Sequence, residues 1–235
     1  MRLIGRRQQN AVGVLQLSDA EMERKVRYQG LTEADLAEVA GWRQVLEERF
    51  DAMVDAFYDR IRREPGAWAV LERHTTVERQ RPMLSDYLST MFSGRIDDAY
   101  LAYRQRVGVV HERIDLDTSY YLAMFEVIQQ HCEETVRAAG AGRDELARFS
   151  AALRRLLQVD ISLCFSVFTE ARRKSVGSLT QMVGDIAATA TEQASTLEEI
   201  SASLIEISDM TSQNATSAQQ AQQLALQQEI AAKVT

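Results

Sequence analysis

The stretch VGVVHERIDL, residues 107–116, holds one of only three histidines in the chain. Apolar side chains of Val107, Val110 and Ile114 surround His111 in the sequence. A histidine in this setting is either a hydrogen-bonded core residue or a ligand presented to a buried group, because a neutral imidazole binds transition metals. Taken alone, His111 favours the core interpretation, and the rest of the sequence has to decide between the two.

A second pattern with chemical consequences lies near the C-terminus. Glu192, Glu199 and Glu206 are seven residues apart, so on a helix they form one strip. Carboxylates in such a strip are solvated and open to a modifying enzyme, and the small side chains of Ser195 and Ala202 would let a protein surface approach them. The plainer interpretation is the solvated acidic face of a coiled coil.

Composition restricts the class of protein. The chain has 235 residues, of which 46% are hydrophobic, with only two prolines and 11 glycines, which indicates long helices rather than a loop-rich β fold. A net charge of −7 argues against a nucleic-acid partner. No apolar run reaches the roughly 18–20 residues that span a membrane, and Cys132 and Cys164 lack a CxxC spacing. We therefore expect a cytoplasmic, all-α, acidic protein with reduced thiols.

Helix signals follow one another from residue 31 onward. Thr32 with Asp35 predicts a helix start, and a stripe of apolar residues at spacings of three and four continues over residues 42–61. Proline and glycine at 65–66 break that helix, and Thr75 and Thr76 predict the next start, with Pro82 early in that helix. The sequence thus predicts helices from Thr32 through Gly41 and beyond, over 42–61, from about 76 to 92, over 97–110 and over 118–139.

After Gly142 no proline occurs, which predicts one helix from Arg143 to the end, on the order of 140 Å long at about 1.5 Å per residue. No globular domain accommodates that length, so roughly the last sixty residues should project as a rod and pair with a partner chain. Apolar residues alternate at spacings of three and four from Val176 to Ile207, which predicts a coiled-coil seam. For residues 215–235, a partly disordered low-complexity tail is the alternative.

The rod contains ASTLEEISAS, residues 194–203, in which small pairs flank an acidic pair. This run resembles the methylation consensus of bacterial chemotaxis receptors, and TEQASTLEEISASLIEISDMTSQNATSAQQA resembles their first adaptation helix. The resemblance implies a methylating enzyme as partner, with Glu199 the best candidate site, followed by Glu192 and by Glu206, where Ile205 replaces the usual second acid or amide. The signalling hairpin tip of those receptors has no counterpart before Thr235, so the chemotaxis kinase and coupling protein are expected partners only if a longer chain supplies it.

Four stretches of the front part also match a known pattern: RYQGLTEADL, DAFYDRI, MFSGRIDDAYLAYRQRVGVVHERIDL and SYYLAMFEV. Together they resemble the globin-coupled sensor family, in particular the haem-based aerotaxis transducers, over about residues 25–172. The resemblance implies an all-α, globin-like sensor domain with a long C-terminal coiled-coil helix. The expected divisions are an N-terminal extension at 1–24, a haem sensor domain at 25–175, and a coiled-coil linker with part of an adaptation helix at 176–235.

The same resemblance assigns roles to individual residues. It implies that His111, at the end of the F helix, is the proximal ligand of a haem b iron, and that Tyr121 lies near its other ring nitrogen. Tyr58 in DAFYD matches the distal tyrosine of the B helix. Its phenol would stabilise bound O2 by about 1.5–3 kcal/mol and would stabilise bound CO by less. Met83 or Leu84 would face the ligand.

Four further residues complete this expected set. His74 would reach a haem propionate or, equally, be an exposed loop histidine, and Phe57 is placed near the cofactor with packing as its main role. His131 is expected to be structural, in a helix that pairs between subunits. Asp115 stands where the family commonly has glycine, and the turn should survive because Asp tolerates left-handed backbone better than most residues.

Sensor and output patterns together predict a homodimeric haem-based oxygen sensor that transmits ligand binding through a helical rod to a chemotaxis module. CO and NO are alternative ligands, and no enzymatic activity is expected. One alternative is a haem-free, globin-like module for signalling and dimerisation. Another is a haem protein that detoxifies NO or peroxide, which is less favoured because neither a reductase domain nor a second distal base is evident.

Overall fold

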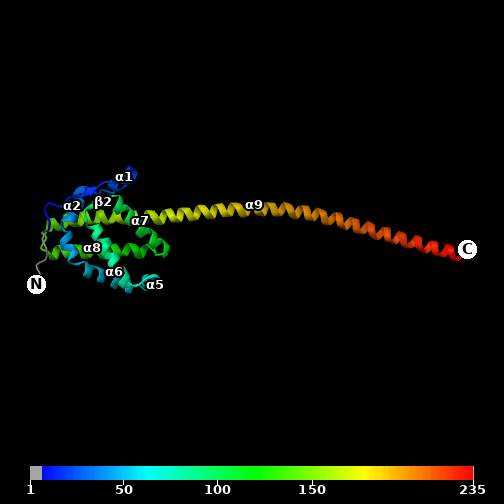
Figure 1. Ribbon diagram of the computed structural model, residues 1–235, viewed down its shortest axis with the longest axis horizontal. Helices are drawn as coiled ribbons and strands as arrows, with labels where there is room; N and C mark the ends of the chain where they lie inside the picture. Colours follow the sequence, from blue (N-terminus) through cyan, green and yellow to red (C-terminus); the bar gives the residue numbers. More distant parts are fainter. Residues whose placement is uncertain (1–6, 235) are drawn as a thin grey trace. The chain divides into compact units, whose positions relative to one another are not determined.

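The computed structural model describes residues 7–234 and is almost entirely helical (Figure 1). Its elements in chain order are β1 (Val14–Leu15), α1 (Ala20–Tyr28), α2 (Glu33–Gly41), α3 (Arg43–Glu47), α4 (Phe50–Arg62), α5 (Pro65–His74), α6 (Val77–Met91), β2 (Arg95–Ile96), α7 (Asp98–Arg113), α8 (Thr118–Ala138) and α9 (Arg143–Val234). The predicted all-α class with a long C-terminal helix is confirmed. Among the described residues, no helix has the length and apolar character needed to cross a membrane.

The chain divides after Arg173 into two units. The first is compact and contains β1 to α8 and the start of α9. The second begins at Lys174 and consists of the remainder of α9, whose side chains are exposed as far as residue 226. The candidate site residues at positions 57 to 121 all belong to the compact unit.

Local capping explains where several helices begin. Thr32 and Asp35 form a reciprocal capping box at α2, with each side chain bonded to the other residue's backbone N–H. Thr76 caps α6 by accepting from the N–H of Arg79 at 3.4 Å, and Pro65 occupies the first turn of α5. The helix starts predicted at Thr32 and Thr76 are therefore confirmed.

The single helix predicted over residues 42–61 is wrong. The structure divides it into α3 and α4, with the N–H of Arg49 donating to the carbonyl of Leu46 at 2.9 Å in a tighter turn. Leu46, Phe50 and Met53 are all buried in the same core on both sides of this turn. The apolar pattern therefore continues across the break, which is why spacing alone did not reveal it.

The N-terminal segment contains a strand that the sequence did not predict. Val14–Leu15 pairs in parallel with Arg95–Ile96, and the N–H of Val14 donates to the carbonyl of Gly94 at 2.9 Å. Gly94 has φ +76°, and a Cβ there would lie 2.7 Å from the Cβ of Ala40, so only glycine suits this turn. The pairing fastens the N-terminal segment to the turn between α6 and α7.

The core of the compact unit forms around α4 and α9. Helix α4 packs against α5, α6 and α8, and α3 packs against α8. The first turns of α9 contribute fully buried side chains, including Phe149, Leu153 and Leu156. This arrangement places α4, α6, α7 and α8, which carry most of the candidate residues, around one continuous core.

Candidate functional site

His111 lies in the last turn of α7, and its Nδ1 is 2.8 Å from the carbonyl oxygen of Val107. Because a carbonyl oxygen only accepts hydrogen bonds, Nδ1 carries the proton, and Nε2 of the neutral ring holds a lone pair. Burial lowers the pKa of His111 below its ordinary value, against the opposing effect of the bond to Val107. The imidazole is therefore neutral at pH 7 and has one nitrogen prepared to bind a metal.

Tyr121 of α8 lies edge-on against the His111 ring, with the ring centroids 5.2 Å apart. Its other ring neighbours are Phe125 on the same helix and Phe165 and Phe168 on α9. The hydroxyl is buried close to the thiol of Cys164, and burial raises the pKa of Tyr121 well above its usual range. The histidine is thus held at Nδ1 by a backbone carbonyl that sequence reasoning missed, while Tyr121 packs against the ring.

Tyr58 of α4 is buried, and its ring meets that of Phe57 at a centroid distance of 5.4 Å. Burial raises the pKa of Tyr58 to about 12, with the positive charge of Arg81 opposing the shift. Arg81 itself pairs with Asp55 at 2.5 Å. The phenol of Tyr58 therefore stays protonated near neutral pH and can donate a hydrogen bond.

The structure separates the two candidates on α6. Leu84 is half-buried and packs against the core, whereas the side chain of Met83 is 55% exposed. His74 is the last residue of α5 and is exposed. His131 on α8 has a buried Nδ1 without a hydrogen-bond partner. The candidate residues thus form two contacting pairs, His111 with Tyr121 and Phe57 with Tyr58.

Asp115 adopts φ +52° in the turn between α7 and α8. Within the described residues it is the one non-glycine residue with a positive φ. The N–H of Leu116 donates to the carbonyl of His111 at 3.1 Å across this turn, which closes the end of the helix that carries the histidine. The expectation that Asp115 adopts the left-handed conformation is confirmed.

A buried polar cluster joins α6, α7 and α9. Arg104 and Asp160 are both fully buried, and Nε of Arg104 is 2.6 Å from Oδ1 of Asp160. The hydroxyls of Tyr87 and Tyr100 donate to the same carboxylate. Nη1 of Arg104 donates to Oγ1 of Thr90 at 2.8 Å. The guanidinium also lies over the Tyr87 and Tyr100 rings, at 3.9 and 4.2 Å from their centroids.

The sequence contains a signal for this cluster. Arg104 stands on the inner face of the predicted helix at 97–110, four residues after Tyr100, and Asp160 interrupts the apolar run LLQVDISL. A charge on an apolar face predicts a buried partner, because an unpaired buried charge is very costly. The partner could not be identified, since 56 residues separate the two.

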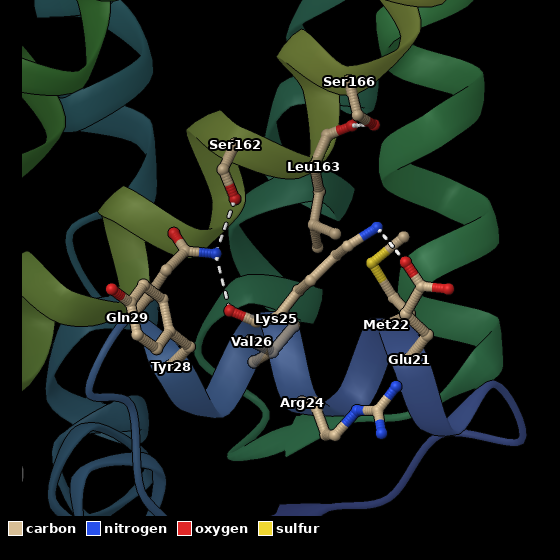
Figure 2. A pocket seen from close by; sticks show the side chains of 10 residues that line it. All are labelled: Glu21, Met22, Arg24, Lys25, Val26, Tyr28, Gln29, Ser162, Leu163 and Ser166. Carbon is tan, nitrogen blue, oxygen red and sulfur yellow. Dashed lines mark hydrogen bonds and ion pairs between the residues drawn. The ribbon is translucent and has the colours of Figure 1, made fainter.

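A groove of about 590 Å³ lies elsewhere, between α1 and α9 (Figure 2). Met22, Val26 and Leu163 contribute apolar side chains to its lining. Gln29 reaches across it, with Nε2 donating to Oγ of Ser162 at 3.0 Å. The candidate residues on α4, α6, α7 and α8 do not line this groove.

The side chains at the predicted site fit a haem group. His111 supplies a neutral, oriented imidazole, and one axial histidine is the usual ligand of haem iron in globins. Tyr58 supplies a buried phenol donor, and the Tyr121 ring packs edge-on against the imidazole. This donor set suits haem iron; next to it Val107 packs against the core, whereas Val110 is 52% exposed.

The second unit carries the other predicted features on its surface. Glu192, Glu199 and Glu206 are exposed along α9. Seam residues such as Leu179, Ile186 and Leu197 are 59–63% exposed in the single chain.

One curated relative is similar to this chain over most of its length. The "Heme-based aerotactic transducer HemAT" of Halobacterium salinarum is 25% identical over 211 residues, covering 82% of this chain and 42% of the relative. The chain thus spans less than half the length of that relative.

Two solved structures share its fold. The globin domain of the Geobacter sulfurreducens globin-coupled sensor matches with a TM-score of 0.57 at 18% identity, covering 64% of this chain and 97% of that one. The ferric globin domain of E. coli DosC matches with a TM-score of 0.52 at 12% identity, covering 63% and 99%. The predicted resemblance to globin-coupled sensors is confirmed. The sequence model of the Protoglobin family matches residues 18–174, more than half of the chain, which therefore belongs to the protoglobin family.

Proposed function

We propose that this protein is a haem-based gas sensor in which His111 is the axial ligand of the iron. The observation that carries the proposal is the hydrogen bond from Nδ1 to the Val107 carbonyl, which leaves Nε2 as the metal-binding nitrogen. The bound group, haem b, would supply a ferrous iron that takes up a diatomic gas. The similarity to an aerotactic transducer supports the same assignment.

The distal residue in this proposal is Tyr58. Its phenol remains protonated, because burial raises its pKa to about 12, and it donates to a ligand that acquires negative charge. Bound O2 acquires more negative charge than CO, so the phenol favours O2. A hydrogen bond of about 1.5–3 kcal/mol corresponds to roughly ten- to a hundredfold in affinity. We therefore propose O2 as the preferred ligand, ahead of CO and NO.

The output in this proposal is the second part of α9. The exposed seam that includes Leu179, Ile186 and Leu197 is covered by the same helix of a second copy in a homodimeric coiled coil. Glu199, and more weakly Glu192 and Glu206, are substrates of a methylating enzyme. The receiving partner is a chemotaxis signalling module, and the chain itself has no catalytic activity.

An absorption spectrum tests the central assignment. Protein produced with ample haemin and then reduced should show a Soret band that shifts on addition of O2 and of CO. His111→Ala should lose this band or show a changed ligand state, whereas His74→Ala, at the exposed end of α5, should keep it. Colourless wild-type protein would favour the haem-free alternative and refute the proposal.

A second measurement tests the role of Tyr58. In Tyr58→Phe, O2 should dissociate about ten to a hundred times faster, while the CO dissociation rate changes much less. Equal changes for the two gases would show that the residue acts by packing alone. The chemistry of a detoxifying enzyme would appear instead as turnover of NO or peroxide by the same reduced protein.

A further inference from the structure

The buried cluster around Arg104 and Asp160 connects α6, α7 and α9. Tyr87 and Thr90 belong to α6, which also carries Met83 and Leu84. Arg104 belongs to α7, seven residues before His111, so both lie on nearly the same face of that helix. Asp160 belongs to α9, which continues beyond the compact unit.

Helices α7 and α9 are also in close contact one turn further along. A Cβ built on Gly108 would lie 2.8 Å from the carbonyl oxygen of Cys164, so the two backbones approach closely there. Sγ of Cys164 is 3.4 Å from the carbonyl oxygen of Arg104. The contact continues through His111 and Tyr121 to Phe165 on α9. Helix α7 therefore contacts α9 directly at Arg104 and at Gly108, and His111 is linked to α9 through Tyr121 of α8.

The polar contacts differ from the apolar ones in how they respond to movement. Apolar side chains can slide over one another with small changes in free energy, whereas a fully buried ion pair cannot separate without leaving an uncompensated charge. Asp160 accepts from Arg104, Tyr87 and Tyr100 at once, so its position is defined by both α6 and α7. Displacement of either helix is resisted at this carboxylate.

We propose that Arg104 and Asp160, with Tyr87 and Tyr100, are positioning residues that couple movement of His111 on α7 to α9. This inference rests on the proposed haem function and extends it by naming the contact through which the signal leaves the sensor. The cluster does not touch the gas ligand. It makes α6, α7 and α9 change position together, so that a displacement of the proximal histidine reaches the helix that continues to the output.

The test is hydrogen–deuterium exchange of the full chain with haem, compared between the reduced and CO-bound forms at spectroscopically verified saturation. In the wild type, CO should change exchange rates of α9 amides around residues 158–171 by roughly fivefold or more. In Tyr100→Phe, which keeps the ion pair and most of the side-chain volume, and in Asp160→Asn, this CO-dependent difference should fall below about twofold. If Asp160→Asn does not fold, Tyr100→Phe and Tyr87→Phe decide the outcome.

The matched control is Asp35→Asn, which disrupts a different ion pair of α9, to Arg155 at 2.5 Å, on the side facing α2. This variant should alter the exchange rates equally in the reduced and the CO-bound protein, and the CO-dependent difference in α9 should remain. If the role of the cluster is merely structural, Tyr100→Phe should also keep the CO-dependent difference in exchange. That result would overturn the inference. Wild-type protein that binds CO without any change in α9 would also overturn it, while leaving the proposed haem function intact. Absence of a Soret band would instead refute both.

Discussion

Helix α9 contains two regions in which similar side chains have different surroundings. In the first, up to Arg173, Leu153, Leu156 and Leu163 are at most 3% exposed. In the second, from Lys174, Leu197, Leu204 and other apolar residues at the same helical spacing are 49–65% exposed. The compact unit covers its own apolar stripe, whereas the second unit needs another surface to cover its stripe.

The difference shows that periodicity specifies which face of a helix is apolar but not what covers it. Burial of a leucine side chain stabilises a fold by about 1.5–3 kcal/mol. In the first region this free energy comes from packing within one chain. In the second region it becomes available only on association, so its effects should depend on protein concentration.

The largest effect should come from the buried charges in the first region. Asp160→Ala leaves the guanidinium of Arg104 buried without its partner and should lower the free energy of unfolding of the compact unit by about 3–5 kcal/mol. Urea unfolding of the variant and the wild type measures this loss. Lys25→Ala, which removes an exposed ion pair with Glu21, is the control and should leave the urea midpoint unchanged. Equal midpoints for Asp160→Ala and wild type would contradict the importance of the cluster.

One substitution made in both regions tests the comparison directly. Leu153→Ala removes a fully buried side chain and should lower the free energy of unfolding by about 2–5 kcal/mol. Leu197→Ala, at a side chain 63% exposed in the single chain, should leave the urea midpoint of the compact unit unchanged. It should instead weaken self-association in sedimentation equilibrium. A wild-type chain that is monomeric in the same experiment would contradict the proposed coiled coil.

A glycine of α7 that faces the first region of α9 and a glycine of the second region should respond to alanine with opposite signs. Gly108→Ala places a Cβ 2.8 Å from a backbone oxygen of α9 and should destabilise the compact unit by about 1–3 kcal/mol. Gly184→Ala meets nothing within 4 Å on an exposed helix and should stabilise that helix by about 1 kcal/mol. Thermal unfolding followed by circular dichroism at 222 nm measures both. The comparison fails if the two substitutions shift the melting curve in the same direction.

The smallest effect concerns pH in the haem-free protein. Burial lowers the pKa of His111 below 6.5, so the unfolded chain binds a proton more readily than the folded chain. The stability contributed by the neutral ring is therefore present above pH 6.5 and is lost as the pH falls towards the lowered pKa. Each tenfold difference in proton affinity between the folded and unfolded chains corresponds to about 1.4 kcal/mol of this stability.

The variant His111→Gln checks this pH dependence. It should lose less free energy of unfolding between pH 7.5 and 5 than the wild type, because glutamine has no proton to take up in that range. Urea titration at each pH measures the two losses. If both proteins lose the same free energy of unfolding between pH 7.5 and 5, the His111 ring is not sheltered from water.

Much of the fold was predictable because its signals are local. The capping box of Thr32 with Asp35, the cap at Thr76 and the left-handed turn at Asp115 each depend on residues within about four positions. The long final helix followed from the absence of proline after Gly142. The break at Arg49 and the pairing of Val14–Leu15 with Arg95–Ile96 were not predictable in this way. The first leaves the apolar spacing intact, and the second joins segments about eighty residues apart.

The candidate site was predictable only as a set of residue types. His111, Tyr121 and Tyr58 were identified through resemblance to the globin-coupled sensors, and the structure describes how each of them is held. The imidazole nitrogen meets the carbonyl of Val107, four residues earlier on the same helix, a contact that the helix allows but that the residue types do not specify. Met83 and Leu84 were equal candidates in the sequence, and packing of α6 buries only Leu84 against the core.

The sequence by itself determined where most helices begin and end, which face of each is apolar, and where an imidazole lies among valines. These properties depend on backbone sterics and on contacts within one or two turns, which the order of residues specifies directly. Only the tertiary structure decided that Arg104 meets Asp160, that burial keeps the His111 ring neutral, and that one stretch of α9 is covered while the other is exposed. Those outcomes depend on which surfaces meet across long separations in sequence, because burial and hydrogen bonding are properties of the packed molecule.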